Sequence, residues 1–286
     1  MQPIAFGDIV GGGEQEIPLS PHNNTLVEYF TADTLEPGEF KAGFELEFSP
    51  FRDFMIGTDL LATSVGAINI QSKWLALRYG EHKIAAGLRG AVLNKETLLW
   101  GSLNDHFETL DARVLNPSLS WTQKFSERLN LHTHWAVGIG KVRAKLSEKG
   151  QRKLWESKHP GKDYDSRNED GEAAKSDTRD SFSKRTLQVQ SITGLTNDLF
   201  QVTGEFQRSP NKKILITSRI DRVQIETLRS NGFRLTAAQQ WIWENFQFRL
   251  GIGLQYQVIS GTDLDGELMD ETGFLPVSDI DFYWRF

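Results

Sequence analysis

Apolar and polar residues alternate with a period of two along most of this chain. In the block 246–258 every even position is apolar and every odd position is polar or glycine. Successive side chains of a strand point to opposite faces, so this block predicts a strand with one apolar and one polar side. The same pattern, clear or weaker, returns in 25–33, 39–48, 54–62, 68–79, 83–92, 112–125, 129–139, 185–195, 200–207, 233–243 and 274–286. Stretches with the helical period of 3.6 are nearly absent.

The connections between these blocks are of two kinds. Tight connections are predicted at 50–53, 80–82, 126–128, 197–198 and 244–245. Longer polar connections lie between them, above all 147–184 and 262–272. Short turns on one rim and long loops on the other are typical of a transmembrane up-and-down β-barrel. A soluble sandwich also has many short strands, but its connections need not alternate in this way.

The number of strands depends on the segment 211–230. A first count gives thirteen strands, whereas a barrel with both termini on one rim needs an even number. A two-residue turn at 221–222 would split the segment and give about fourteen strands. A β-bulge there would instead leave one strand, and merging another pair would give twelve. We therefore expect an all-β antiparallel barrel of about fourteen strands, with twelve as the alternative.

Composition narrows the function classes. The chain has 38% hydrophobic residues, which is too many for a disordered protein, and a net charge of −6, which argues against a nucleic-acid partner. It has no cysteine, so disulfides and thiolate chemistry are excluded. No apolar run reaches the ~18 residues of a membrane helix. Residues 1–24 carry no signal-peptide pattern and predict a flexible periplasmic lead before a single barrel domain, 25–286.

The last strand carries a family resemblance. Phe282, Trp284 and Phe286 alternate with polar or charged residues in the final block 274–286. This ending resembles the terminal strand of Gram-negative outer-membrane β-barrel proteins, and the size is similar to that of the small monomeric porins. The resemblance implies an integral protein of the bacterial outer membrane, recognised by the barrel-assembly machinery through these three aromatics. It also implies contact with membrane lipid and lipopolysaccharide. No motif of a particular family is matched, so no functional residues carry over.

In such a barrel the apolar faces point to lipid and the polar faces to the lumen. A set of aromatics near the short-turn rim predicts an interfacial girdle: Phe54, Phe125, Trp241, Trp243, Phe246, Trp284 and Phe286. The lumen-lining residues, expected to set ion selectivity, are Glu45, Glu47, Asp59, Arg89, His132, His134, Arg219, Glu226, Arg234, Arg249, Asp279 and Asp281. A fourteen-stranded barrel is too wide for side chains to fill. The main expectation is therefore a monomeric porin-like channel for small polar solutes or ions, without catalysis, cofactor or metal.

Two alternatives stay open. One is a lipid-handling or enzymatic barrel, because register places Ser120 opposite His134 and Thr122 opposite His132 on the inward face. A serine beside a histidine begins a nucleophile–base pair, although no third orienting group is identifiable. The other is a closed barrel that acts in surface interaction through the 147–184 loop, which would otherwise gate the pore. The acidic residues of the two long loops lack the spacing of a calcium loop.

Overall fold

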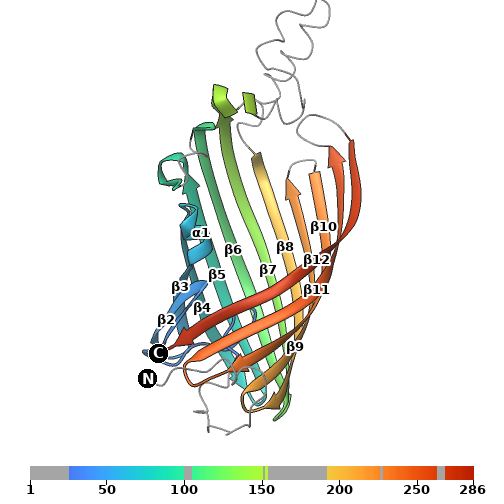
Figure 1. Cartoon of the computed structure of the whole chain (residues 1–286). Coiled ribbons are helices and arrows are strands. Elements are labelled where there is room, and N and C mark those ends of the chain that lie inside the picture. Colours follow the sequence, from blue (N-terminus) through green and yellow to red (C-terminus); the bar gives the residue numbers. More distant parts are fainter. Residues whose placement is uncertain (1–25, 100–104, 151, 154–191, 226–227, 263–267) are drawn as a thin grey trace, which may run out of the picture.

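The chain folds into one closed barrel of twelve antiparallel strands, each paired with its neighbours in sequence (Figure 1). The computed structural model describes residues 26–99, 105–150, 152–153, 192–225, 228–262 and 268–286. The first half comprises β1 (Phe40–Gly43), β2 (Glu45–Phe51), β3 (Phe54–Asp59), β4 (Ile68–Tyr79), β5 (His82–Asn94) and β6 (Phe107–Ser126). The second half comprises β7 (Leu129–Leu146), β8 (Ile192–Ser209), β9 (Lys212–Ile225), β10 (Leu228–Ile242), β11 (Phe246–Thr262) and β12 (Leu268–Arg285). A short helix, α1 (Leu60–Ser64), follows β3, and a 3₁₀ turn, η3 (Lys95–Thr97), follows β5.

The predicted fold class is confirmed, with the alternative count of twelve strands rather than fourteen. The turns predicted at 197–198 and 221–222 are wrong, because both pairs lie inside strands, β8 and β9. Asp198 lies directly opposite Arg222 in the β8–β9 ladder. Opposite charges paired across two strands stabilise a sheet, so these turn-forming residue types remain in extended structure.

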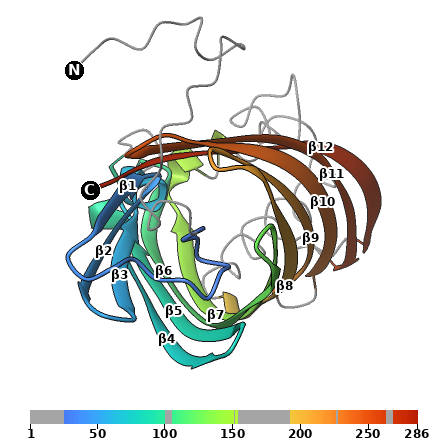
Figure 2. The ribbon, with the colours of Figure 1, turned by 90° about the horizontal axis from the view of Figure 1, so that it is seen from below.

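Two further segments depart from the expected strands. The block 39–48 is not one strand, because β1 and β2 form a hairpin around Phe44. The predicted strand 25–33 is also wrong: its described residues, from Leu26 on, form no strand and are largely buried. Seen from below, this segment runs inside the barrel (Figure 2). Residues 26–35 are called the plug from here on.

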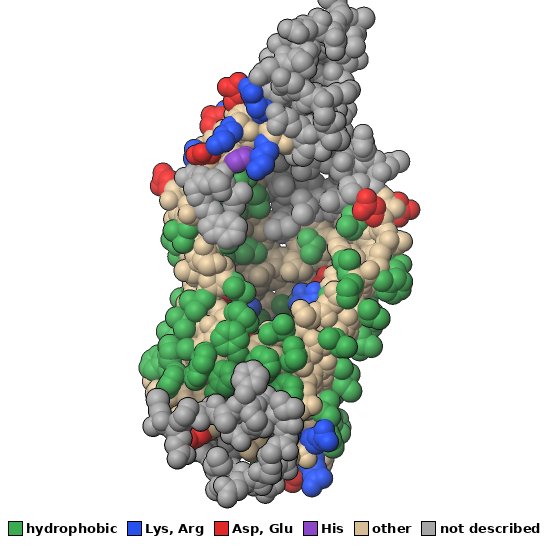
Figure 3. All heavy atoms as spheres, viewed as in Figure 1, with side chains coloured by type: hydrophobic (Ala, Val, Ile, Leu, Met, Phe, Trp, Pro, Cys, Tyr) green, Lys and Arg blue, Asp and Glu red, His purple; other side chains and the backbone are tan. Residues whose placement is uncertain are grey.

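Apolar side chains cover the outer surface of the barrel (Figure 3), whereas many polar side chains are buried on its inner surface. Large outward-facing residues include Ile70, Trp135, Ile216, Ile252 and Ile280, all exposed. This polarity is the reverse of that of a soluble barrel and matches a wall surrounded by lipid. No helix within the described ranges has the length and apolarity needed to cross a bilayer.

The seven aromatics of the predicted girdle lie at strand ends beside the short turns. Trp243 stacks on Phe246 with ring centres 5.4 Å apart, and Phe246 contacts Trp284 at 4.8 Å. Phe286 closes the barrel, because its backbone exchanges hydrogen bonds of 2.9 and 3.0 Å with Phe40. Their role at a membrane interface, and that of Phe282, Trp284 and Phe286 in assembly, stay predictions.

The wall of the barrel is not equally tall all round. The strands β1, β2 and β3 have 4, 7 and 6 residues, whereas β12 has 18. The ladder between β12 and β1 spans only Tyr283, Trp284 and Arg285. From Leu268 to Phe282, no described strand pairs with this edge of β12. The cylinder is therefore complete only near the short turns, and above β1–β3 it has a gap, called the lateral notch below.

Candidate functional site

The plug is held in the lumen by side chains of the surrounding wall. Lys73 Nζ donates to the backbone oxygens of Glu28 (2.8 Å) and Thr31 (3.3 Å). The Ala32 N–H donates to Thr122 Oγ1 at 2.9 Å. A buried chain without secondary structure must find partners for its backbone groups elsewhere, and here inward side chains supply them. Three small apolar clusters, around Leu26, Val27 and Ala32, complete the packing.

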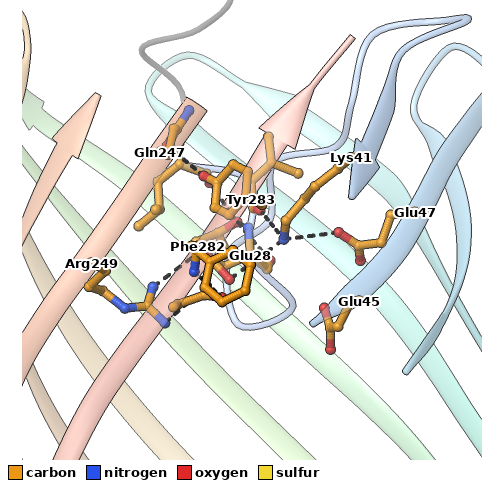
Figure 4. Close-up of polar contacts among 12 residues, drawn as sticks. Glu28, Lys41, Glu45, Glu47, Gln247, Arg249, Phe282 and Tyr283 are labelled. Atoms are coloured by element: carbon orange, nitrogen blue, oxygen red, sulfur yellow. Dashed lines mark hydrogen bonds and ion pairs between the residues drawn. The ribbon is translucent and has the colours of Figure 1, made fainter. Parts of the chain in front are cut away.

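Glu28 is the ionic link between the plug and the strands on both sides of the seam, the ladder between β1 and β12 (Figure 4). Its carboxylate lies 3.8 Å from Lys41 Nζ and 3.3 Å from an Arg249 nitrogen. Arg249 also contacts Asp279 (2.9 Å) and Asp281 (3.3 Å) on β12. Burial alone would raise the pKa of the Glu28 carboxyl, but Lys41 and Arg249 outweigh it and hold that pKa below its usual value. Glu28 is therefore ionised at neutral pH.

The predicted porin-like channel is wrong, because the plug fills the lumen at the short-turn end. Val27, Thr31 and Ala32 are 0% exposed, so side chains and not water occupy this part of the barrel. The predicted barrel was too wide. The prediction counted residues 25–33 as wall, whereas they fill the interior of a narrower, twelve-stranded barrel. Open passage of solutes through this end is incompatible with that packing.

Above the plug lies a polar cavity of about 470 Å³, called the chamber. Its floor is formed by Glu28, Tyr29 and Phe30 of the plug. Gly43 and Phe44, at the β1–β2 hairpin, and Leu61 of α1 also line it, so the chamber reaches the lateral notch. In the space-filling view the molecule is hollowed in its middle at this level (Figure 3).

The chamber wall offers paired charges and two side-chain amide oxygens without hydrogen-bond partners among the described residues. Arg89 lies 2.6 Å from Glu45, and its guanidinium sits 3.5 Å from the centre of the Tyr29 ring. The side-chain oxygens of Asn116 and Asn197 are buried and have no hydrogen-bond partner in the part of the chain that the structure describes. Gly138 makes room for both, since a Cβ there would lie 2.3 Å from Asn116 Oδ1. Buried polar atoms that lack partners are costly, so these two amides are suited to bind a ligand.

The predicted lumen residues all lie on the inner face where they are described. Seven line the chamber: Glu45, Asp59, Arg89, His134, Arg219, Arg249 and Asp281. Glu47 and His132 are buried at the level of the plug, Asp279 pairs with Arg249, and Arg234 bonds to Gln255. Glu226 lies outside the described residues. Their expected role in ion selectivity required an open channel, so it is withdrawn together with the channel prediction.

The predicted pairing of the two histidines is confirmed by the β6–β7 register. Ser120 Oγ lies 2.9 Å from His134 Nδ1, and Thr122 Oγ1 lies 2.9 Å from His132 Nδ1. The third group missed from the sequence is Glu205, whose carboxylate lies 2.9 Å from His132 Nε2. It was missed because the false turn at 197–198 left the register of β8 against β7 undetermined.

The two hydroxyl–histidine pairs differ in access. Thr122, His132 and Glu205 are at most 5% exposed and lie at the level of the plug, where Glu205 also pairs with Lys213 at 2.9 Å. They form a buried structural network. His134, in contrast, lines the chamber. Within the described ranges no group of three potential metal ligands occurs, and most of the 147–184 loop lies outside them.

Comparison with known proteins gives distant structural likenesses. No family model matches the chain, and no curated protein matches it. The outer-membrane expressed OmpT of Vibrio cholerae has a TM-score of 0.36 and 9% identity, over 85% of this chain and 63% of that one. The chain thus spans less than two thirds of that protein. LpxR from Salmonella typhimurium has a TM-score of 0.32 and 8% identity, over 76% of this chain and 88% of that one.

These likenesses are too distant to carry function. The resemblance to outer-membrane β-barrel proteins is confirmed at the level of fold by the closed twelve-stranded barrel with its apolar outer face. What the chamber does has to be argued from its own residues.

Proposed function

We propose that this protein is a lipid-handling barrel of the outer membrane. The polar headgroup of a lipid enters the chamber sideways through the lateral notch, while its acyl chains stay outside the wall. The observation that carries the proposal is the position of the chamber: the plug closes it below, and the wall beside it is interrupted.

The unpaired edge of β12 supports this direction of entry. Backbone groups cannot be left without partners in hydrocarbon, where each costs several kcal/mol. Beside the lateral notch, the backbone of β12 between Leu268 and Phe282 faces no described strand on this edge. The hydroxyl, ester or amide groups of a lipid headgroup are suitable partners, whereas acyl chains are not.

The lining of the chamber favours a headgroup without a strong net charge. Its ionisable carboxylates and cations are equal in number: Glu28, Glu45, Asp59 and Asp281 against Lys41, Arg89, Arg219 and Arg249. Such a balanced lining suits a zwitterionic or hydroxyl-rich headgroup better than a multiply charged anion. The volume of about 470 Å³ lies within the range of small-molecule pockets, ~300–1,000 Å³.

The proposal is tested by lipid-delivered labelling of a single cysteine, since the native chain has none. Ala136→Cys places a thiol in the chamber. In bilayers that contain a phospholipid with a maleimide headgroup, we expect this thiol to become covalently bound to lipid, as read by intact mass. Ala85→Cys is the matched control, because Ala85 is on the inner face but 0% exposed beneath the plug. Both thiols should react after unfolding.

The opposite result would contradict lateral entry. If Ala136→Cys reacts with a water-soluble maleimide but not with the maleimide lipid, the chamber opens to water alone. The proposed function would then be rejected.

A second function is favoured by the Ser120–His134 pair at the chamber floor. We propose ester hydrolysis of the bound lipid, in which His134 takes the Ser120 hydroxyl proton as Oγ attacks the ester carbon. The proton then passes to the departing alcohol, and water releases the acyl group from Ser120. The backbone oxygen of Tyr29 lies 3.3 Å from Ser120 Oγ, so the plug has to shift at this point for the ester to reach it.

Hydrolysis is tested with two matched hydroxyl deletions. Ser120→Ala should abolish release of fatty acid from reconstituted lipid, whereas Thr122→Ala should not, because Thr122 belongs to the buried network with His132 and Glu205 and does not line the chamber. Labelling of Ala136→Cys in the Ser120→Ala background reports headgroup entry separately. Equal fatty-acid release from both deletion variants would reject a role for Ser120.

A further inference from the structure

A second concave region lies on the outer face of the barrel, away from the chamber. It is a groove of about 980 Å³ across β1–β7. Its lining is mainly apolar and includes Phe48, Ile56, Ile70, Leu115 and Ile139, all of them exposed. On a lipid-facing wall the neighbouring molecules are acyl chains, which a concave apolar surface can accommodate.

Two cations border this groove at its long-loop end. Arg113 on β6 lies directly opposite Lys141 on β7, and both line the groove. Directly below them on the same strands lie Leu115 and Ile139, also on the outer face. The two cations thus mark the upper border of the apolar band, at the depth where lipid phosphates lie.

The two adjacent cations, Arg113 and Lys141, would be stabilised by a bound anion. Like charges directly across a ladder destabilise a sheet, since their Cβ atoms are only ~4.5–5.5 Å apart. Arg113 contacts Asp111 at 3.1 Å, but Lys141 has no ion-pair partner in the described part of the chain. Arg143, the next outward residue on β7, adds a third cation to this edge and lies opposite Asp111. Among the described residues, one carboxylate therefore faces three cations.

We infer that this groove is a binding site for a phosphate-bearing lipid of the leaflet on the long-loop side. The phosphate lies between Arg113 and Lys141, where it can accept charge-assisted hydrogen bonds from both, and the acyl chains lie along the apolar groove. The site uses no residue of the plug and does not depend on headgroup entry through the lateral notch, so it stands apart from the function proposed above.

Gly90 gives access to the apolar half of the site without disturbing the wall. It lies on the outer face of β5 and lines the groove. A Cβ at this position would meet Leu115 Cδ1 at 3.7 Å, an ordinary contact. A large side chain introduced here should therefore project into the groove and occupy the space of an acyl chain.

The test is native mass spectrometry of the full chain in detergent, titrated with dipalmitoyl phosphatidic acid or with dipalmitoylglycerol, which lacks the phosphate. We expect the wild type to prefer the phosphatidic acid at least tenfold. The double variant Arg113→Gln/Lys141→Gln should lose this preference. Its matched control is Arg222→Gln/Arg229→Gln, which removes two cations from β9 and β10 outside the groove and should keep it. Gly90→Phe, or Gly90→Leu if the larger residue prevents folding, should weaken binding of both lipids.

Three outcomes would overturn the inference. The first is equal binding of the two lipids by the wild type. The second is an unchanged preference in Arg113→Gln/Lys141→Gln. The third is unaltered binding by both folded Gly90 variants, which would leave the phosphate contact without the groove. Folding of every variant is checked by heat-modifiable migration in gels.

Discussion

Single buried charges hold the plug of this barrel in place. Glu28 contributes most, since its carboxylate forms ion pairs with both Lys41 on β1 and Arg249 on β11. A buried ion pair adds little net stability when complete, but removing one partner leaves an uncompensated charge and costs ~3–5 kcal/mol. Replacing only one partner of these ion pairs should therefore destabilise the plug.

Glu28→Gln should loosen the plug. Loss of the carboxylate leaves Arg249 and Lys41 with one partner fewer, and we expect a cost of about 3 kcal/mol. Hydrogen–deuterium exchange of residues 26–35 measures this directly. The control is Asp33→Asn, whose partner Lys83 is 35% exposed in its side chain, so the cost should stay below ~1 kcal/mol. Equal exchange in the two variants would contradict the role given to Glu28.

The same residue predicts an acid limit for the plug. The pKa of Glu28 is lowered from its ordinary value of 4.5, so the stability it gives is complete above that value and is lost as pH falls through the lowered pKa. The loss of the Glu28 contribution should therefore raise the exchange of residues 26–35, corrected for intrinsic rates, below about pH 4.5. In Glu28→Gln this acid-dependent step should be smaller. A step of equal size in both proteins would show that other groups control it.

At the scale of elements, the seam between β1 and β12 has only three residue pairs and is, together with the β1–β2 ladder, the shortest of the barrel. Gly43 is essential to it, because a Cβ at this position would lie 2.2 Å from the backbone oxygen of Phe282. A side chain there has to push the two strands apart. Closure of the cylinder thus depends on close backbone approach at one residue.

Gly43→Val should destabilise the closed barrel by about 1–3 kcal/mol, the usual cost of overpacking. The expected result is a lower midpoint of the heat-modifiable gel shift. Gly90→Ala is the matched control, because its added Cβ meets only ordinary contacts and should leave the midpoint unchanged. A wild-type midpoint for Gly43→Val would show that the seam tolerates separation.

Sequence alternation was enough to place most of the strands in the wall, because lipid on one side and polar groups on the other impose a period of two. Alternation was misleading where a segment with the same pattern is not part of the wall. Residues 26–33 alternate like a strand, yet their partners are lumen side chains such as Lys73 and Thr122. These partners are distant in the sequence, so the local pattern cannot predict them. The Ser120–His134 pair followed from one turn and its register, whereas Glu205 required a second register that a false turn had hidden.

At the scale of the whole molecule, the barrel is closed at one end and open at one side. Plug, chamber and lateral notch follow one another along the lumen, and under the proposed function the interior communicates with the membrane and not with both aqueous phases. This arrangement also sets the electrical behaviour of the protein.

The wild-type protein should show no discrete conductance steps in a planar bilayer. Val27, Thr31 and Ala32 are 0% exposed, so the described part of the plug is packed against the wall at the short-turn end, where ions would have to pass. Insertion is verified in the same preparation by resistance of the barrel to protease. Reproducible single-channel steps from inserted protein would contradict the packing of the plug.

The short strands β1–β3 also affect the bilayer around the protein. The 7 residues of β2, at ~3.3 Å each and a tilt of ~40°, span only about 18 Å, against an apolar band of ~25 Å on a typical outer-membrane barrel. Hydrophobic mismatch of this kind thins and disorders the adjacent lipid. The protein should therefore carry a local dimple in the membrane at β1–β3, which lowers the energy needed to pull a lipid out of its leaflet beside the lateral notch.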